Sequence, residues 1–358
     1  MSEGPVRNMQ QLRVRWLGES PDGGSLRDAA LRGIREAAAA GHALEGAAAD
    51  LRGISLAGEE LSGADFSRCD LSGADFSDAK LAGAKFSWAV LRGATFCRAH
   101  IESCEFLAAD LTGANLSEAH AERSGFGAAR MVDANLLQAR MSGATLSKAD
   151  LTGADLRTAD LQRARLCDAV CRKASFMAAD LRGADLTGMM IGGASFNRAD
   201  LRESTFYGLK EYESSTWVEA DIRSIDFCGA YLVRRYIMDE NYLHEFRTKS
   251  RFHGFLYRIW WLTSDCGRSF ARWAAFTVVL ALSFAVLYQL VDVDWGEKRG
   301  FLSSFYFSVV TLTTLGYGEI TPRSGTAQVL AISEAVLGYV VLGGLLSILA
   351  NKMARRAE

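Results

Sequence analysis

The sequence predicts a multidomain protein in which a solenoid with a five-residue period is followed by an all-α domain with two membrane-spanning helices. Three observations support this fold class. Apolar residues recur at every fifth position from residue 51 to residue 206. Two apolar runs, 273–291 and 324–351, are each long enough to cross about 30 Å of hydrocarbon as a helix. The composition also changes near Arg234 and Arg235, from segments rich in Ala, Asp, Leu and Gly to long runs without charge.

The five-residue period is very regular. The 32 positions from Leu51 to Phe206 are all apolar, and 26 of them are Leu or Phe. Ala stands two places before 25 of these positions. An α-helix repeats about every 3.6 residues and a strand every two, so neither keeps a period of five in phase. The backbone must therefore turn a corner in every five-residue unit.

This pattern resembles the pentapeptide repeat family, whose A(D/N)LxX units appear here as Ala64-Asp65-Phe66, Ala114-Asn115-Leu116 and Ala154-Asp155-Leu156. The resemblance covers residues 47–235 and implies a right-handed four-sided β-helix. A second observation agrees with four sides, because all nine Phe of the repeat fall in every second unit. With four units per coil, these rings would stack in two opposite columns inside the solenoid.

Both ends of such a solenoid need closure. In the N-terminal segment 1–46, Ser25 is a candidate N-cap and Gly41 a stop signal, which predicts a capping helix over residues 25–40. At the other end the register slips after Phe206. We expect a surface loop over residues 207–216, after which the apolar positions resume one residue late at Ile222, Phe227 and Leu232.

The charge balance argues against nucleic acid as a partner. The whole chain has 40 basic and 42 acidic residues, and residues 46–235 have 22 and 26. Some pentapeptide repeat proteins imitate the acidic surface of DNA, but so small an excess favours a rigid cytoplasmic spacer or assembly domain. The histidines show no ligand spacing along the chain, so no metal site is expected among His42, His100, His120, His244 and His253.

The C-terminal domain, residues 270–358, is predicted to span the membrane twice, at about 270–291 and 324–351. Basic residues flank the two spans on their outer sides, while the connection between the spans has mixed charge. This bias predicts that both termini and the β-helix lie in the cytoplasm. The expected location is a bacterial inner membrane, with the chain as a multi-pass membrane protein. The flanking basic residues are Arg247, Lys249, Arg251, Arg258, Arg268 and Arg272 before the first span, and Lys352, Arg355 and Arg356 after the second.

The linker, residues 236–269, is predicted to contain a helix that lies on the inner membrane surface. Its apolar side chains share one helical face, and two Trp follow them. Aromatic rings at headgroup depth are typical of such helices, so membrane lipid is an expected partner. A linker helix that stays in solution is the alternative. The residues concerned are Phe252, Phe255, Leu256, Ile259, Trp260 and Trp261.

A short apolar segment lies between the two spans, at residues 301–313, and Thr314-Leu315-Gly316-Tyr317-Gly318 follows it. Irregular backbone at membrane depth is tolerated only where protein buries it or where it lines a water-filled path. Gly316 and Gly318 can adopt positive φ, which allows successive carbonyl groups to face one axis. Rings of such carbonyls from several chains can replace the water shell of a cation.

This segment resembles the selectivity filter of the two-transmembrane potassium channel pore family, and the resemblance covers about residues 270–351. It implies a pore helix and filter over residues 301–318, and a homotetramer with three further identical subunits. K⁺ would be the permeant ion, no cofactor is implied, and no gating ligand can be identified. The ion-coordinating residues would be Thr314, Leu315, Gly316 and Tyr317, with Gly318 completing the filter.

The chain departs from the commonest pattern of that family in four places, one of which is the pair Tyr306-Phe307. Leu315 replaces the usual Val, and Glu319 the usual Asp. Tyr306 and Phe307 stand where many members carry two Trp, and Val310 takes a position that is acidic in some members. Together with Glu319, Tyr306 and Phe307 are expected to form the mouth of the filter and to support it. These departures leave potassium selectivity as the expectation and bear on filter stability and inactivation.

Two residues of the second span are candidates for special roles. Glu334 is the one acid in that span, and an unpaired charge there would cost at least about 2–3 kcal/mol. We expect it behind the filter, protonated or hydrogen-bonded to the pore helix; a cavity-facing charge that attracts cations is the alternative. Gly338 matches the position of the hinge glycine in the family, with close helix packing as the other interpretation.

The leading functional hypothesis is therefore a potassium-selective channel with a cytoplasmic repeat domain for assembly or gating. Two alternatives remain: a repeat module, as scaffold or DNA mimic, that the helices anchor to the membrane, and a weakly selective cation channel. The intact Gly-Tyr-Gly argues against weak selectivity. An enzyme is not expected, since the sequence has no nucleophile paired with a base, no phosphate loop and no dinucleotide-binding glycine pattern.

Overall fold

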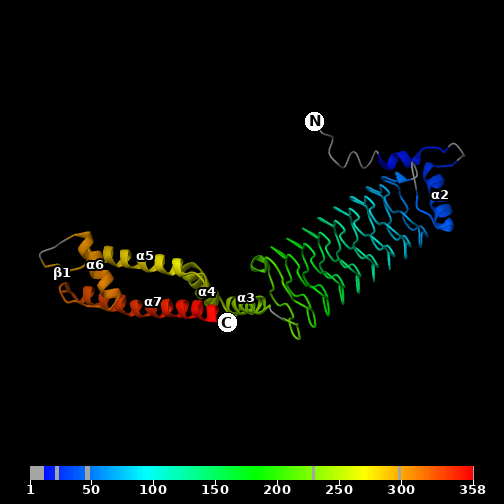
Figure 1. Cartoon of the computed structure of the whole chain (residues 1–358). Helices are drawn as coiled ribbons and strands as arrows, with labels where there is room; N and C mark the ends of the chain where they lie inside the picture. The colour runs from blue at the N-terminus through cyan, green and yellow to red at the C-terminus, as the bar shows by residue number, and fades with distance from the viewer. Residues whose placement is uncertain (1–11, 21–23, 45–48, 228–229, 297–299, 358) are drawn as a thin grey trace. The chain divides into compact units, whose positions relative to one another are not determined.

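A computed structural model describes residues 12–20, 24–44, 49–227, 230–296 and 300–357 (Figure 1). The chain divides into two compact units, Met1–Tyr242 and Leu243–Glu358, and each is considered by itself. The first unit is the solenoid with its closing helices, and the second is helical. The solenoid is accompanied by η1 (Arg15–Leu17), α2 (Leu26–Ala40), η3 (Tyr212–Ser214) and the first part of α3 (Tyr231–Thr248).

The solenoid is a four-sided β-helix, because its parallel bridges join residues that are four five-residue units apart, such as Asp50 to Asp70 and Ser55 to Asp75. Each five-residue unit closes a tight turn, as where the Ile54 amide donates to the Leu51 carbonyl at 3.1 Å. The third residue of the turn has positive φ in every unit from Gly53 to Gly208. Type II turns need this conformation, so each unit makes one corner of the coil.

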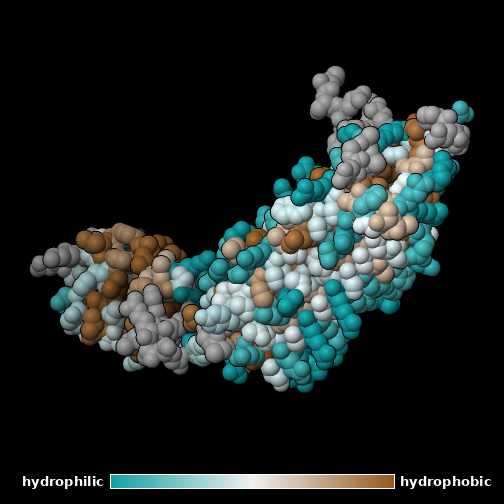
Figure 2. Space-filling view, turned by 45° about the vertical axis from the view of Figure 1, so that its right-hand side comes forward, coloured by the Kyte–Doolittle hydropathy of each residue, from teal (hydrophilic) through white to brown (hydrophobic). Residues whose placement is uncertain are grey.

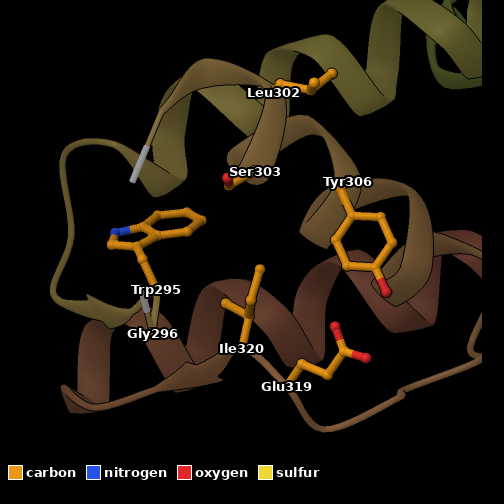
Figure 3. A pocket seen from close by; sticks show the side chains of 7 residues that line it. All are labelled: Trp295, Gly296, Leu302, Ser303, Tyr306, Glu319 and Ile320. Atoms are coloured by element: carbon orange, nitrogen blue, oxygen red, sulfur yellow. The ribbon is translucent and has the colours of Figure 1, made fainter. Parts of the chain in front are cut away.

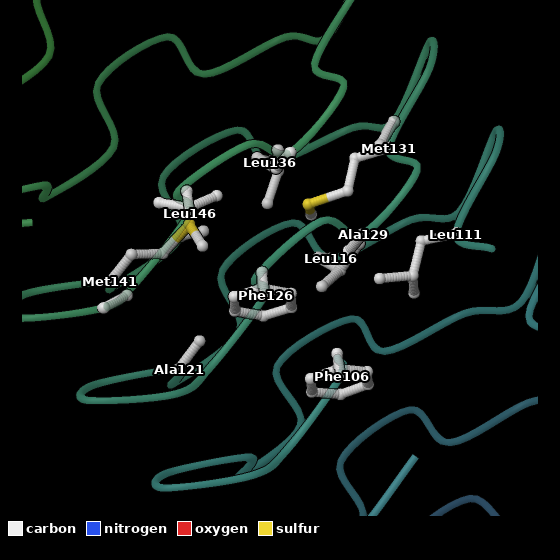
Figure 4. Close-up of a cluster of buried hydrophobic side chains, with 14 of the residues drawn as sticks. Phe106, Leu111, Leu116, Ala121, Phe126, Ala129, Met131, Leu136, Met141 and Leu146 are labelled. Carbon is white, nitrogen blue, oxygen red and sulfur yellow. The ribbon is translucent and has the colours of Figure 1, made fainter. Parts of the chain in front are cut away.

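The core of the solenoid contains the two aromatic columns that the sequence predicted. Phe66 and Phe86, one coil apart, stack with ring centroids 5.0 Å apart, and Phe76 and Phe96 do the same at 4.8 Å. Rings of opposite columns meet edge to face, with 5.7 Å between the centroids of Phe76 and Phe86. Figure 4 shows Leu116, Leu136 and Leu146, which take the place of Phe in these columns, and Ala121, Met131 and Met141, which belong to the other two columns.

Helix α2 closes the N-terminal end of the solenoid. The Ser25 hydroxyl accepts a hydrogen bond from the Asp28 amide at 3.1 Å, and Gly41 ends the helix with a φ of 72°. The apolar face of α2 is buried against the first coils, with Ile34 only 2% exposed. The N-cap and stop residues expected from the sequence are thus the ones that bound the helix.

Near the other end, fewer residues interrupt the repeat than the predicted loop over residues 207–216 would require. Met190 still pairs with Lys210, one regular coil further on, whereas Ser195 pairs with Thr216 instead of Ser215. A single extra residue is therefore accommodated around η3. Trp217, which the sequence analysis missed, is fully buried and stacks on the Phe196 ring with centroids 4.3 Å apart.

Helix α3 closes this second end. Leu232 lies in α3 and is 59% exposed, so its assignment to the repeat was wrong. Ile237 of the same helix is fully buried and belongs to the solenoid core. Glu240 accepts a hydrogen bond from the Trp217 amide at 2.8 Å, and Asn241 accepts one from the Glu219 amide at 2.7 Å. The side chains of α3 thereby satisfy backbone donors that have no further coil to pair with.

The second unit is built from α4 (Arg251–Ser264), α5 (Phe270–Tyr288), α6 (Phe301–Leu312) and α7 (Gly325–Ala357). Two short antiparallel strands, β1 (Val293–Asp294) and β2 (Thr321–Pro322), join the ends of the α5–α7 connection. Helices α5 and α7 are long and apolar enough to cross a membrane. Hydrophobic residues cover much of the surface of this unit (brown in Figure 2), as expected of helices that face lipid.

Candidate functional site

The predicted filter residues lie directly after the short helix α6. Leu312 is the last residue of α6, and residues 314–318 lead from it toward β2 without regular secondary structure. The packing of α6 against α5 and α7 positions this segment, and the β1–β2 pair fixes its far end. A non-helical segment is thus held between two helices that can each span a bilayer.

The backbone of this segment alternates in the sign of φ. Thr314, Gly316 and Gly318 have φ values of 58°, 52° and 78°, while Leu315 and Tyr317 between them do not have positive φ. This alternation lets successive carbonyl groups turn to the same side, whereas a regular strand points them to opposite sides. Positive φ was expected at the two glycines; at Thr314 it was not, because a β-branched residue rarely adopts it.

The side chains of the segment are largely exposed in a single subunit. Leu315 is 61% exposed and Tyr317 is 63% exposed, although both are large. Nearby, Tyr306 and Glu319 line a pocket together with Trp295, Leu302 and Ile320, and the Tyr306 hydroxyl and the Glu319 carboxylate lie on facing sides of it (Figure 3). Phe307, in contrast, is buried against Tyr288 of α5, with ring centroids 4.8 Å apart.

Glu334 of α7 is the centre of a buried polar network. Its carboxyl group is fully buried, one oxygen contacts the Ser308 hydroxyl of α6, and the other accepts a hydrogen bond from the Tyr288 hydroxyl of α5 at 2.6 Å. The contact with α6 is the arrangement expected from the sequence, and its role in supporting the filter stays a prediction. Because no part of Glu334 is exposed, the alternative of a cavity-facing charge is wrong.

The count of protons in this network favours a neutral carboxyl group. The Ser308 hydroxyl also lies 2.9 Å from the Ala281 carbonyl oxygen, which can only accept. A serine hydroxyl has one proton, so it cannot donate to both the carbonyl and a carboxylate. All three contacts are hydrogen bonds if Tyr288 donates to Glu334, protonated Glu334 donates to Ser308, and Ser308 donates to Ala281. The network then joins three helices without a buried charge.

Sequence reasoning did not identify Tyr288 and Ser308 as parts of this site. Both are fully buried, and both lie on helices that are largely apolar. A signal was present, because polar side chains within apolar segments usually have polar partners on neighbouring helices. What the sequence could not give is which of several hydroxyl groups would meet Glu334.

Gly338 of α7 lies against the end of α6. A Cβ atom added there would lie 2.9 Å from the carbonyl carbon of Leu312 and closer still to its oxygen. Real Cβ atoms do not approach so closely, which supports the close-packing interpretation. The contact is with the last residue of α6, two positions before the filter segment. A hinge role for Gly338 stays a prediction.

We expect Gly338→Ala to impair folding or conduction through the filter, because the added methyl group must push the end of α6 away from α7. The measurement is the yield of assembled protein and the K⁺ flux that it supports in liposomes. Gly343→Ala is the matched control. Gly343 lies in the same helix as Gly338, and a Cβ atom added there would meet nothing within 4 Å. Equal behaviour of the two variants would contradict the packing argument.

Comparisons with known proteins agree with this division of the chain. Residues 275–355 match a family model described as ion channel. A model of pentapeptide repeats matches eight copies, within residues 47–83, 79–118, 126–157, 157–188 and 179–210.

Potassium channel proteins are among the curated relatives, and they match a short stretch of the chain. A human voltage-gated potassium channel regulatory subunit, KCNG2, is 35% identical over 80 residues, which are 22% of this chain and 17% of the relative. Two-pore potassium channel 1 of Arabidopsis thaliana is 34% identical over 80 residues, 22% of each chain. The matched stretch is therefore less than a quarter of either relative.

Among solved structures, HetL, a pentapeptide repeat protein of the cyanobacterium Nostoc, is 27% identical, with a TM-score of 0.36 over 49% of this chain and 87% of that one. The chain thus matches pentapeptide repeats within residues 47–210 and an ion channel model at residues 275–355, and a stretch of 80 residues is similar to potassium channels.

Proposed function

We propose that this protein is one of four identical subunits of a potassium-selective channel. The observation that carries the proposal is the segment Thr314–Gly318, with φ alternating in sign, held between two helices long enough to span a membrane. Carbonyl oxygens of Thr314, Leu315, Gly316 and Tyr317 would form rings around the axis and replace the hydration shell of K⁺. Conduction is passive, and the chain supplies only the geometry.

Four subunits are proposed because one chain contributes only one such segment. A ring around a permeant ion requires a closed symmetric assembly. The exposure of Leu315 and Tyr317 in one subunit supports this, since neighbouring subunits would cover large side chains at the centre of the assembly. Tyr306 and Glu319 would then contact the neighbouring filter at its mouth.

The proposed location is a bacterial inner membrane. The Lys and Arg that flank the spans support the proposed orientation, with the solenoid in the cytoplasm. Helix α4 supports contact with the membrane surface, because its apolar side chains are exposed in a single subunit. Phe252 is 65% exposed, Phe255 59% and Leu262 71%. Such a helix would lie at headgroup depth with its aromatic rings toward the lipid.

For the solenoid we propose a role in assembly or gating. Helix α3 supports the coupling, because it begins as the closing element of the solenoid and continues past Tyr242 into the second unit. A helix that is fixed at one end transmits displacement over its length better than a flexible linker. Movement of the solenoid would therefore reach α4 and α5 through this helix.

The test measures ion flux through the purified full-length protein in liposomes. K⁺ flux is measured in one set of liposomes and Na⁺ flux in another. We expect K⁺ flux to exceed Na⁺ flux by at least about 100-fold, because the carbonyl cage replaces the water shell of K⁺ alone. Gly316 has a φ of 52°, which disfavours any side chain. The Gly316→Ala variant should therefore reach the membrane but conduct no K⁺. Equal fluxes of the two ions would overturn selectivity, and an unaltered Gly316→Ala variant would overturn the filter assignment.

A further inference from the structure

His100, Glu102 and His120 form a cluster on the side of the solenoid, far along the chain from the proposed filter. The tripeptide pattern His-x-Glu occurs at residues 100–102 and again at residues 120–122. This separation is one full coil, because His100 pairs with His120 in the parallel ladder. The spacing of the histidines along the chain does not indicate this cluster, because its members lie on two consecutive coils.

The distances in this cluster suit a metal ion. His100 Nδ1 lies 2.9 Å from Glu102 Oε1, and His120 Nδ1 lies 3.9 Å from the same oxygen. The ligand atoms of all three residues lie within 4.8 Å of one another. Tetrahedral Zn²⁺ with bonds of about 2.0–2.2 Å holds its ligand atoms about 3.3 Å apart. Small rotations of these side chains would therefore bring their ligand atoms to the distances that Zn²⁺ requires.

Glu122, whose carboxylate lies outside that set of three, is a neighbour of the cluster along the backbone. The Ser103 amide donates to the Glu122 carbonyl at 3.0 Å, so Glu122 lies beside residues 102 and 103 in the next coil. Its Oε2 atom is buried and has no hydrogen-bond partner in the part of the chain that the structure describes. A buried carboxylate oxygen without a partner is costly, and a cation nearby would remove that cost.

Both neighbours of the cluster in its column are basic. In the ladder that pairs His100 with His120, the residue one coil before His100 is Lys80. The ammonium group of Lys80 lies 3.4 Å from the carboxylate of Glu60, which is one further coil away from the histidines. The following residue of the column is Arg140. Two carboxylates balance the charge of one divalent ion, and neutral imidazoles complete the set of ligands.

We propose that His100, Glu102 and His120, with Glu122 as the fourth ligand, bind one divalent transition-metal ion of the Zn²⁺ class. Imidazole nitrogen selects such ions, whereas Mg²⁺ and Ca²⁺ prefer oxygen ligands throughout. The ion would link two consecutive coils, so that its binding stabilises the solenoid against unfolding. The proposal concerns the repeat domain and does not depend on ion conduction.

The experiment uses the full-length protein without a polyhistidine tag, in detergent and freed of metal with a chelator. Zn²⁺ is titrated against a chromophoric chelator, and the thermal midpoint is measured with Zn²⁺ and with Mg²⁺. We expect one Zn²⁺ per chain and a midpoint raised by Zn²⁺ alone. His120→Ala and Glu102→Gln should each weaken binding by more than about 100-fold, beyond the loss that outer-sphere partners cause.

His42→Ala is the control, because His42 is an exposed histidine outside the cluster. It should bind Zn²⁺ as the unaltered protein does. Visible absorption of bound Co²⁺ gives a second readout, and it should change in Glu122→Gln even where that variant still binds. Zn²⁺ binding that survives His120→Ala, absence of stoichiometric binding in the folded protein, or equal stabilisation by Mg²⁺ would each overturn the proposal.

Discussion

Glu334→Ala should lower the thermal stability of the assembled protein and reduce K⁺ flux, whereas Glu334→Gln should come close to preserving both. Alanine removes the acceptor of the Tyr288 hydroxyl, and Tyr288 is fully buried. A buried hydroxyl left without a partner costs about 1–3 kcal/mol, and the cavity adds to this cost in each subunit. Glutamine can accept from Tyr288 and donate to Ser308, so it replaces a neutral carboxyl group without a change in size.

The measurements are the midpoint of thermal unfolding in detergent and the rate of K⁺ uptake by liposomes. Ser308→Ala should show a smaller loss than Glu334→Ala, since it removes one link of the network and leaves the Tyr288 contact in place. Ser283→Ala is the matched control, because this hydroxyl donates only within its own helix, to Val279 at 2.8 Å. A Glu334→Gln variant as damaged as Glu334→Ala would show that the carboxyl group acts through a negative charge.

The solenoid was predictable from the sequence because its period leaves almost no freedom. Once each unit makes one corner and four units make a coil, every apolar position is assigned to the core, and the Phe columns follow. The helices of the second unit were predictable for a different reason. Length and absence of charge in α5 and α7 are sufficient to identify spans, since lipid requires every backbone group to be satisfied within the helix.

What the sequence could not give are contacts between residues that are distant in the chain and lie outside the period. The single-residue slip at η3 moved Trp217 into the Phe column, but a scan for Leu and Phe at the old spacing skipped it. The His100–His120 pair is visible only when residues one coil apart are compared. Ser308 and Tyr288 meet Glu334 through the packing of three helices, which no local pattern encodes.

Phe86→Ala should destabilise the solenoid by about 3–5 kcal/mol, as is typical of a large aromatic residue lost from a core. Phe86 is fully buried and contacts four other rings, two stacked in its own column and two edge to face across the axis. Alanine would remove all four contacts and leave a cavity that rigid coils above and below cannot fill. Trp88→Ala is the matched control, because Trp88 lies on the same coil and is 60% exposed.

The location of the damage is as informative as its size. Each coil of a solenoid contacts only its neighbours, so the loss should stay local. Hydrogen exchange should therefore accelerate in peptides that cover residues 66–106, and protection should persist around Phe176 and Phe196, which stack in the opposite column several coils away. Uniform acceleration over the whole repeat would mean that the solenoid unfolds as a single cooperative unit. In that case a disturbance in one coil would reach α3 directly, and the coupling proposed for gating would extend to the N-terminal coils.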